Sequence, residues 1–352
     1  MTASASKAAG WLRVTPAGLY CEPGDFYVDP ARAVARAVVT HGHADHARPG
    51  NEAVLATPET LEIMKVRYGD AAGRTQQPLK YGQRQEIGGV TVWFAPAGHV
   101  LGSAQAVLEW QGRRVVVSGD FKRRPDPTCT GFEVVPCDVF ITEATFGLPV
   151  FRHPPDEEEI GKLLRAQELF PDRAVLLGAY SLGKAQRLIA LLRAAGYERP
   201  IFLHGALKKL TELYESLGIP LGDLRPMQGM GKADLKGEIV MAPPSALNDR
   251  WSRRLPEPLT AMASGWMTVR QRARQRGAEL PLVVSDHADW DELTRTLEEV
   301  AAPEVWVTHG NEEALVHYAR GRGFDARALS LLGRGEEEQE AAEGAEPAEV
   351  AS

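Results

Sequence analysis

The sequence predicts an α/β protein built from more than one domain. Up to about residue 150 the chain is rich in short strand-like runs, and its histidine and aspartate residues follow the ends of those runs. Beyond that point strands alternate with helices, which is the pattern of βαβ units and of a parallel sheet. A length of 352 residues is enough for about two domains of ordinary size.

Strands dominate the first part of the chain. Several of these runs are short and nearly unbroken in apolar residues, as buried strands tend to be. The expected strands cover residues 11–14, 18–21, 26–29, 37–40, 90–95, 113–118 and 139–142.

Helices and strands alternate in the middle of the chain. A helix is expected over residues 156–170, because acidic residues fill its first turn. The expected strands that follow cover 174–177, 201–203, 238–241 and 259–262, with helices at 184–195 and 207–217. The glycine- and proline-rich stretch 220–236 is expected to be a loop. Strands at 281–285 and 305–308 then precede helices at 289–300 and 312–320.

Composition places the chain among globular proteins of a reducing compartment. The hydrophobic content is 44%, and no apolar run approaches the ~18 residues of a membrane span. The first ten residues lack the apolar core of a signal peptide, so we expect a cytoplasmic protein. Cys21, Cys129 and Cys137 form no CxxC pair, which argues against a disulfide framework and for ordinary packing.

The net charge of −7 is concentrated at the C-terminus. Residues 333–352 hold seven glutamates and one arginine, so the other 332 residues sum to about −1. This segment is too poor in apolar residues to order itself, and we expect a disordered acidic tail. The body carries basic clusters, each of which fits either a solvated face or a phosphate contact. They are Lys122–Arg124, Lys208–Lys209, Arg253–Arg254 and Arg270–Arg276.

The segment His41-Gly42-His43-Ala44-Asp45-His46 carries the clearest chemical signal. Four side chains of the type that binds zinc and its neighbours fall within six residues, directly after an expected strand. His41 and His43 share one side of an extended segment, whereas Asp45 and His46 follow where the chain turns. We therefore expect the two pairs to face two different metal ions.

Three isolated residues complete the ligand set. His99, Asp120 and His309 each come directly after or shortly after an expected strand. Alone, each would be a weak signal, because a single such residue after a strand is more often structural or at the surface. Together with the cluster they predict one ion held by His41, His43 and His99. A second ion is then held by Asp45, His46 and His309, with Asp120 bridging the two. Two divalent ions ~3.5–4 Å apart activate water at neutral pH and offset the charge of a phosphoryl transition state.

These residues resemble the metallo-β-lactamase superfamily. The resemblance rests on the HxHxDH segment, His99, Asp120 and His309, and it implies an αββα sandwich with metals at one edge. Asp29, at the end of an expected strand, resembles the aspartate that supports the metal site from behind.

Three further segments are similar to the β-CASP nucleases of that superfamily. Residues 142–147, 284–289 and 307–311 resemble their motifs A, B and C. The resemblance implies a β-CASP domain inserted between motifs A and B. The expected domains are residues 1–155 and 277–332 for the metallo-β-lactamase part, 156–276 for the insertion, and 333–352 for the tail. A histidine at motif C, His309, sides with the RNA-processing and prokaryotic branches.

The most detailed likeness is to the bacterial ligase-associated DNA exonucleases, and it covers nearly the whole chain except the tail. It rests on residues 18–21, 24–30, 45–50, 179–187 and 263–267. It implies a two-metal DNA exonuclease acting in repair on single strands or DNA ends, with an ATP-dependent DNA ligase and a helicase as partners. The ligand types accept Zn²⁺ or Mn²⁺.

The resemblance also implies roles beyond the metals. His287 is expected to donate a proton to the leaving 3′-oxygen, oriented by Glu143, and Asp45 joins these two as a catalytic residue. Ser181 and Lys184 open a helix after a strand, which fits a phosphate site or a plain helix cap with a solvated lysine. Trp266 fits base stacking or simple packing.

Three alternatives stay open on the sequence. The first keeps the fold and makes the substrate RNA, and the second is a small-molecule metallohydrolase. The third is a non-catalytic scaffold that binds nucleic acid, although all seven ligand positions are filled. The insertion of roughly 120 residues between motifs A and B argues against the small-molecule enzyme.

Overall fold

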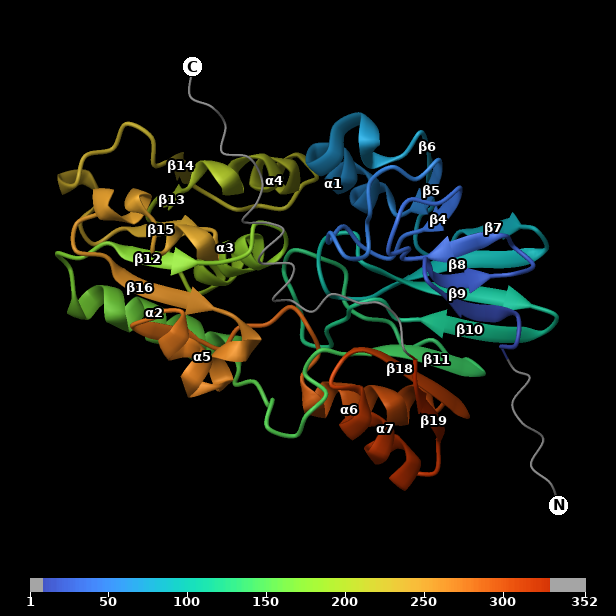
Figure 1. Cartoon of the computed structure of the whole chain (residues 1–352). Helices are drawn as coiled ribbons and strands as arrows, with labels where there is room; N and C mark the ends of the chain where they lie inside the picture. The colour runs from blue at the N-terminus through green and yellow to red at the C-terminus, as the bar shows by residue number, and fades with distance from the viewer. Residues whose placement is uncertain (1–8, 330–352) are drawn as a thin grey trace. The chain divides into compact units, whose positions relative to one another are not determined.

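The chain, described by a computed structural model over residues 9–329, divides into two compact units (Figure 1). Within these residues, the first unit comprises the chain up to Arg152 and from His287 onward. The second unit is His153–Asp286. Because the chain leaves the first unit and returns to it, the second unit is an insertion. The expected acidic tail, residues 333–352, lies outside the described residues.

The second boundary differs from the expected one at residues 276 and 277. Strand β17 (Leu280–Leu282) pairs in parallel with β16 (Leu259–Ala263) and so completes the sheet of the inserted unit. The return to the first unit therefore comes only at His287, after this last strand.

The first unit contains two sheets. One has the strand order β1-β2-β3-β4-β5-β6, in which β1 to β3 are antiparallel neighbours and β3 to β6 are parallel neighbours. Its strands are Leu12–Thr15, Gly18–Cys21, Phe26–Val28, Arg36–Val38, Ala53–Ala56 and Thr75–Pro78.

The other sheet of the first unit has the order β19-β18-β11-β10-β9-β8-β7. In chain order its strands are Arg84–Ile87, Val90–Pro96, Ala104–Trp110, Arg113–Val117, Val139–Ala144, Glu304–Gly310 and Asp325–Ala328. Strand β11 pairs in parallel with both β10 and β18, so the ends of these three strands meet at one edge.

Helices cover the outer faces of both sheets. Leu19 and Val28 of one sheet pack with Val115 and Ile141 of the other in a single core, so the two sheets lie face to face. Helix α1 (Pro58–Tyr68), followed by the short 3₁₀ helix η1 (Gly69–Ala72), packs on the outer face of the first sheet. Helices α6 (Trp290–Val300) and α7 (Glu312–Gly321) pack side by side on the second. The expected αββα sandwich is confirmed.

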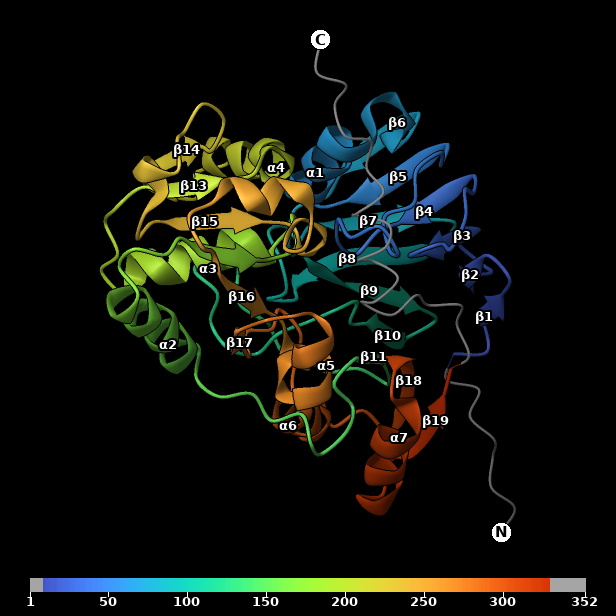
Figure 2. The ribbon, with the colours of Figure 1, turned by 60° about the vertical axis from the view of Figure 1, so that its left-hand side comes forward.

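The inserted unit is built on one fully parallel sheet with the order β14-β13-β15-β12-β16-β17, as Figure 2 shows. The strands not yet given are β12 (Val175–Gly178), β13 (Ile201–Leu203), β14 (Leu224–Pro226) and β15 (Ile239–Ala242). Every residue of β12, β13 and β15 is buried, as expected for a sheet covered on both faces.

Each face of this sheet has its own cover. Helices α2 (Asp156–Leu169), α3 (Lys184–Ala194) and α4 (Gly205–Ser216) are neighbours in a row on one face. The other face, which presents Leu176, Val240 and Met262, is covered by short helical segments. These are η2 (Ala233–Leu235), η3 (Pro244–Ala246), η4 (Arg250–Arg254), η5 (Gly265–Thr268) and α5 (Arg270–Gln275).

The described helices are all short or polar compared with a membrane span. None of them is long and apolar enough to cross a bilayer.

Candidate metal centre

Asp29 links two neighbouring strand ends in the first unit. It follows β3 in a left-handed backbone conformation, with a φ of 45°. Its carboxylate accepts hydrogen bonds from the main-chain N–H of Thr40, at 2.8 Å, and from the Thr40 hydroxyl, at 2.6 Å. The carboxylate also lies 2.8 Å from Nδ1 of His46. Asp29 therefore fixes both the start of the histidine segment and the ring of His46, the supporting position that the sequence assigns to it.

Four buried side chains converge beside that segment. The possible ligand atoms of His41, His43, His99 and Asp120 all lie within 4.8 Å of one another. His41 Nε2 is 3.3 Å from Oδ2 of Asp120, and His99 Nε2 is 3.0 Å from Nδ1 of His43. These residues come from three places, the turns after β4, β8 and β10, which the sheet edges bring together. They are the set expected around the first ion, with the expected bridging aspartate.

The chemistry of this cluster fits a bound metal ion. Nε2 of His41 and Nε2 of His46 are buried without a hydrogen-bond partner among residues 9–329, which is costly unless a ligand takes the lone pairs. Burial lowers the pKa of His43 and of His99 well below the ordinary value, so both rings are neutral, as ligation requires. Burial opposes ionisation of Asp120, but nearby His46 and His287 hold its pKa well below the usual range. The cluster is therefore able to hold metal ions.

The residues expected around a second ion are also neighbours. His46 Nε2 is 3.5 Å from Oδ2 of Asp45 and 3.4 Å from Oδ2 of Asp120. The rings of His46 and His309 have their centroids 5.1 Å apart. Burial lowers the pKa of His46, yet the carboxylates of Asp120, Asp45 and Asp29 together raise it well above its ordinary value. Such a concentration of negative charge on one imidazole favours a cation at this position.

A bulge presents His309. Thr142 pairs with Val307 and Ala144 with Gly310, so β18 has two residues where β11 has only Glu143. The extra length places His309 in a left-handed conformation, with a φ of 53°. Bulges of this kind re-aim side chains at functional sites.

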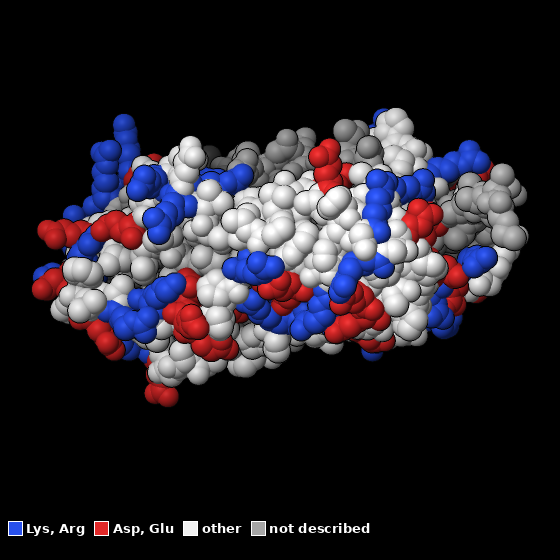
Figure 3. Space-filling view, turned by 90° about the horizontal axis from the view of Figure 1, so that it is seen from below, with Lys and Arg blue, Asp and Glu red and all other residues white. Residues whose placement is uncertain are grey.

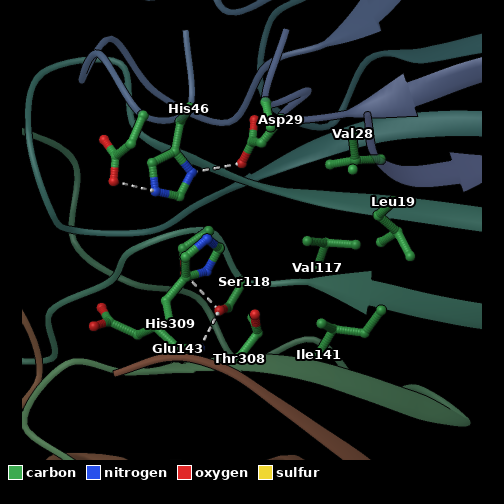
Figure 4. Close-up of a pocket in the computed structure, with 14 residues that line it drawn as sticks. Leu19, Val28, Asp29, His46, Val117, Ser118, Ile141, Glu143, Thr308 and His309 are labelled. Carbon is green, nitrogen blue, oxygen red and sulfur yellow. Dashed lines mark hydrogen bonds and ion pairs between the residues drawn. The ribbon is translucent and has the colours of Figure 1, made fainter. Parts of the chain in front are cut away.

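A cavity between the sheets lies behind these residues (Figure 4). The apolar side chains of Leu19, Val28, Val117 and Ile141 line one end of it, and His46, His309 and Glu143 lie toward the other. The apolar end belongs to the inter-sheet core, so this core directly supports the metal-binding side chains.

Glu143 and His287 form a close pair at the same edge. Nδ1 of His287 lies 3.0 Å from Oε2 of Glu143, and Oε1 of Glu143 accepts a hydrogen bond of 2.7 Å from the N–H of Phe121. The same His287 nitrogen is 4.0 Å from Oδ2 of Asp120. The pair is placed as the resemblance implies, although Asp120, Glu143 and His287 are also compact enough to hold a metal.

The three expected substrate contacts lie in the inserted unit. Lys184 is buried, with Nζ 3.1 Å from Oδ2 of Asp286, so it is not a solvated lysine. The first two amides of α3 are already used, because the N–H of Lys184 donates to the carbonyl of Leu182 and the N–H of Ala185 to that of Tyr180. Ser181 is half-buried, and the indole of Trp266 already stacks with Arg272 at 4.0 Å. Roles of Ser181, Lys184 and Trp266 in substrate binding stay predictions.

The basic cluster Lys122–Arg124 is not a phosphate-binding face. Lys122 is 1% exposed. Arg123 pairs with Glu299, and Arg124 lies 2.9 Å from Oδ2 of Asp289. Each of the three charges is therefore engaged inside the first unit. Lys122 approaches the segment of His287, a role that the sequence reading missed because it treated the run as a surface feature.

Known proteins are similar to this chain in sequence and in fold. Residues 29–178 match the family model described as the metallo-β-lactamase superfamily. The chain is 31% identical over 318 residues to a protein of Opitutus terrae named probable DNA ligase. The similar region covers 89% of this chain and 30% of that protein. It is 26% identical over 308 residues to cleavage and polyadenylation specificity factor subunit 3 of Dictyostelium discoideum. That similar region covers 73% of this chain and 40% of the relative. This chain therefore spans well under half the length of these two relatives.

A bacterial relative of similar length and a solved structure are also similar to this chain. A ribonuclease of Thermus thermophilus is 25% identical over 394 residues, covering 88% of this chain and 89% of the ribonuclease. A protein of unknown function from Enterococcus faecalis V583 shares the fold, with a TM-score of 0.57 and 14% identity over 85% of this chain and 80% of that one. With its His/Asp cluster and with relatives among the β-CASP nucleases, the chain carries a metallo-β-lactamase domain.

Proposed function

We propose that the protein is a two-metal-dependent DNA exonuclease that trims DNA ends before a DNA ligase seals them. The observation that carries the hydrolytic part is the convergence of His41, His43, His99 and Asp120, extended through Asp120 to His46. When bound there, two divalent ions supply an activated water and offset the charge on the phosphate.

The chain's own residues provide the rest of the proposed reaction. The Glu143 carboxylate lies beside Nδ1 of His287 and orients the ring. Nε2 is then the nitrogen that donates a proton to the leaving 3′-oxygen. Asp29 keeps His46 in one tautomer, because its carboxylate accepts a hydrogen bond from Nδ1–H. Asp45 adds a second carboxylate beside His46.

The choice of DNA rests on one relative. The protein named probable DNA ligase contains a stretch equivalent to 89% of this chain within a much longer polypeptide. A nuclease and a ligase act on the same kind of DNA end, and their presence in one polypeptide would pass that end directly from trimming to sealing. The proposed partner is therefore a DNA ligase, and a helicase is expected from the family resemblance alone.

RNA is the second candidate substrate, because other relatives are named a ribonuclease and a polyadenylation factor subunit. The ligand set of nitrogen and oxygen donors accepts Zn²⁺ and Mn²⁺ alike. Both ions therefore belong in the assay, and so do both nucleic acids.

The test uses end-labelled single strands of DNA and RNA with one sequence, incubated with Zn²⁺, Mn²⁺ or a chelator. We expect metal-dependent shortening of the linear DNA and no cleavage of a circular DNA strand. An Asp120→Ala variant should be inactive, and Asp70→Ala, which removes an exposed carboxylate of the same unit, should be unchanged.

Each other outcome has a distinct meaning. Shortening of RNA alone would replace the DNA assignment by a ribonuclease. Cleavage of the circle would make the enzyme an endonuclease. Binding of both strands without cleavage by the metal-loaded protein would support the non-catalytic scaffold instead.

A further inference from the structure

The inserted unit contains a strongly basic segment in a chain that is acidic overall. Residues 244–278 hold seven arginines against two acidic residues, Asp249 and Glu257, a net charge of +5. The whole chain has a net charge of −7. So large a local excess of one sign calls for a physical explanation, because like charges repel in the folded state.

The fold gathers these arginines on one side of the sheet. They come from η4, from α5 and from the residue after it, and both elements pack on the same core through Leu255 and Ala273. The side chain of Asn248, before η4, donates to the main-chain carbonyl of Arg276, after α5, at 3.5 Å. We call the exposed members the arginine surface, which consists of Arg250, Arg253, Arg254, Arg270 and Arg274.

The described residues offer the arginine surface no neutralising carboxylates. Over residues 9–329, none of its five side chains forms an ion pair with a carboxylate. Some arginines elsewhere in the same unit do form such pairs, since Arg173 pairs with Glu279 and Arg225 with Asp223. Figure 3, which views the molecule from below, shows basic and acidic side chains interspersed on that face. Five unpaired guanidinium groups therefore distinguish this surface.

An aromatic contact stiffens its neighbourhood. The guanidinium of Arg272 lies over the ring of Trp266 at 4.0 Å, which anchors α5 to η5. Trp251, in η4, is half-buried and meets the edge of His204 at 4.6 Å between ring centroids. The helical segments that carry the exposed arginines are therefore held in place by these two contacts.

We propose that the arginine surface binds the phosphate backbone of a single-stranded nucleic acid, in addition to the metal centre. The choice of partner rests on the proposed function. Arginine suits it because its planar fork pairs with phosphate oxygens in two parallel hydrogen bonds. Contacts to phosphates carry no sequence information, so the surface would hold any strand that extends beyond the nucleotide being cleaved.

The test separates strand binding from hydrolysis. Two double variants, R253A/R254A and R270A/R274A, are compared with K208A/K209A, which removes two exposed charges from α4 on the opposite face of the same sheet. Binding of a fluorescent 20-nucleotide DNA strand is titrated at several salt concentrations. Hydrolysis of bis(4-nitrophenyl) phosphate reports the metal centre alone, because this small diester has no strand to hold.

We expect each arginine pair to weaken strand binding about tenfold at low salt. The slope of log Kd against log salt should fall by about 1.4, at ~0.7 for each lost phosphate contact. Turnover of the small diester and the thermal midpoint should not change. The lysine control should bind like the unmodified protein.

Three results would overturn the proposal. The first is that both arginine variants bind the strand with the same affinity and the same salt dependence as the lysine control. The small-diester turnover and the thermal midpoint could fall together with strand affinity, which would make the effect structural. An acidic peptide of equal charge could bind as tightly as DNA and lose affinity in the same variants. If the unmodified protein binds strands through this surface but never cleaves any diester, the proposed function fails while this inference stands.

Discussion

The ammonium group of Lys122 lies 3.3 Å from the main-chain carbonyl oxygen of His287, in the interior of the metallo-β-lactamase unit. Its Nζ is also 3.8 Å from Oε2 of Glu292. Two residues further on, Arg124 contacts Asp289, the N-cap of α6. The turn that carries His287 is therefore attached from one side to the strand end that carries Asp120.

Replacing Lys122 with Met should damage both stability and turnover. The substitution keeps the length of the side chain but leaves the buried Glu292 carboxylate to Arg124, whose Nε lies 3.5 Å from it. Leaving a buried charge without any partner costs about 3–5 kcal/mol. We expect the free energy of unfolding in urea to fall by less than this amount, because Arg124 still offsets part of the charge. Turnover should fall as well, at unchanged metal content, because His287 loses its attachment.

Arg123→Met is the matched control, since Arg123 is partly exposed and pairs with an exposed Glu299. It should cost less free energy of unfolding than Lys122→Met, because the Glu299 carboxylate that it leaves behind is 41% exposed. Equal losses for the two variants would show that Lys122 has no special role at the His287 turn.

The role of Lys122 illustrates a limit of sequence reading. Three consecutive basic residues look like a solvated patch, because exposure is the usual state of a charged run. Lys122 is buried against the carbonyl of His287, which is 165 residues away in the sequence. A local sequence pattern cannot predict so distant a partner. The metal ligands of the HxHxDH segment were easier to predict, because the residue types and their spacing within six residues are enough to indicate a metal site.

Helix α1 shows the same limit for the fold. Its buried residues include Leu61, Ile63 and Met64, whereas Val66 is exposed, so its apolar residues do not form one stripe with a period of 3.6. No helix was expected there. The N-cap of the helix is Thr57, whose hydroxyl oxygen accepts a hydrogen bond from the N–H of Thr60. The same hydroxyl donates to the carbonyl of Gly102, so the start of the helix depends on tertiary structure. The strands beside the metal ligands were predicted because their apolar runs are continuous.

Variants of His287 and Glu143 can distinguish two uses of this pair. If His287 transfers a proton, His287→Ala should lower turnover by about 10²–10⁴ and leave the metal content unchanged. Glu143→Gln should lower it less and shift its pH profile, because the ring keeps its place but loses the carboxylate. Loss of one equivalent of metal in His287→Ala, measured by elemental analysis, would show that His287 is a ligand instead.

Metal binding should stabilise the folded protein. The buried Nε2 atoms of His41 and His46 accept no hydrogen bond among residues 9–329, so a metal should bind the folded chain far better than the unfolded one. At a free metal concentration 100 times Kd, the stabilisation is about 2.7 kcal/mol. We expect the thermal midpoint to rise by roughly 5–10 °C on adding Zn²⁺ or Mn²⁺ to the chelated protein. Asp120→Asn should abolish most of this rise, and an unchanged midpoint in the unmodified protein would contradict a metal site.

Two cysteines should make the stability depend on alkaline pH. Burial raises the pKa of Cys21 to about 11 and that of Cys137 to about 12, from an ordinary value of 9.0. The unfolded chain therefore loses these protons first, so their stabilising effect is complete below pH 9 and declines as the pH rises toward 11. A Cys21→Ala/Cys137→Ala variant should show a weaker decline in unfolding free energy over this range. An identical decline would mean that other groups cause it.

Gly310 should tolerate no side chain, for two separable reasons. Its φ is 114°, a region that L residues avoid, and a Cβ atom there would lie 2.3 Å from the carbonyl oxygen of Ala144. Gly323 offers the matched control, since its φ is 92° but nothing lies within 4 Å of its Cβ position. Gly323→Ala should therefore report the conformational cost alone, about 1–3 kcal/mol.

Gly310→Ala must in addition move the backbone of β11 away from the bulge that presents His309. We expect it to lose clearly more unfolding free energy than Gly323→Ala, and to bind less metal at a given free concentration, because His309 shifts relative to His46. Equal unfolding free energies for the two variants would show that the bulge yields easily. The position of His309 would then depend on its metal rather than on the strand pairing around it.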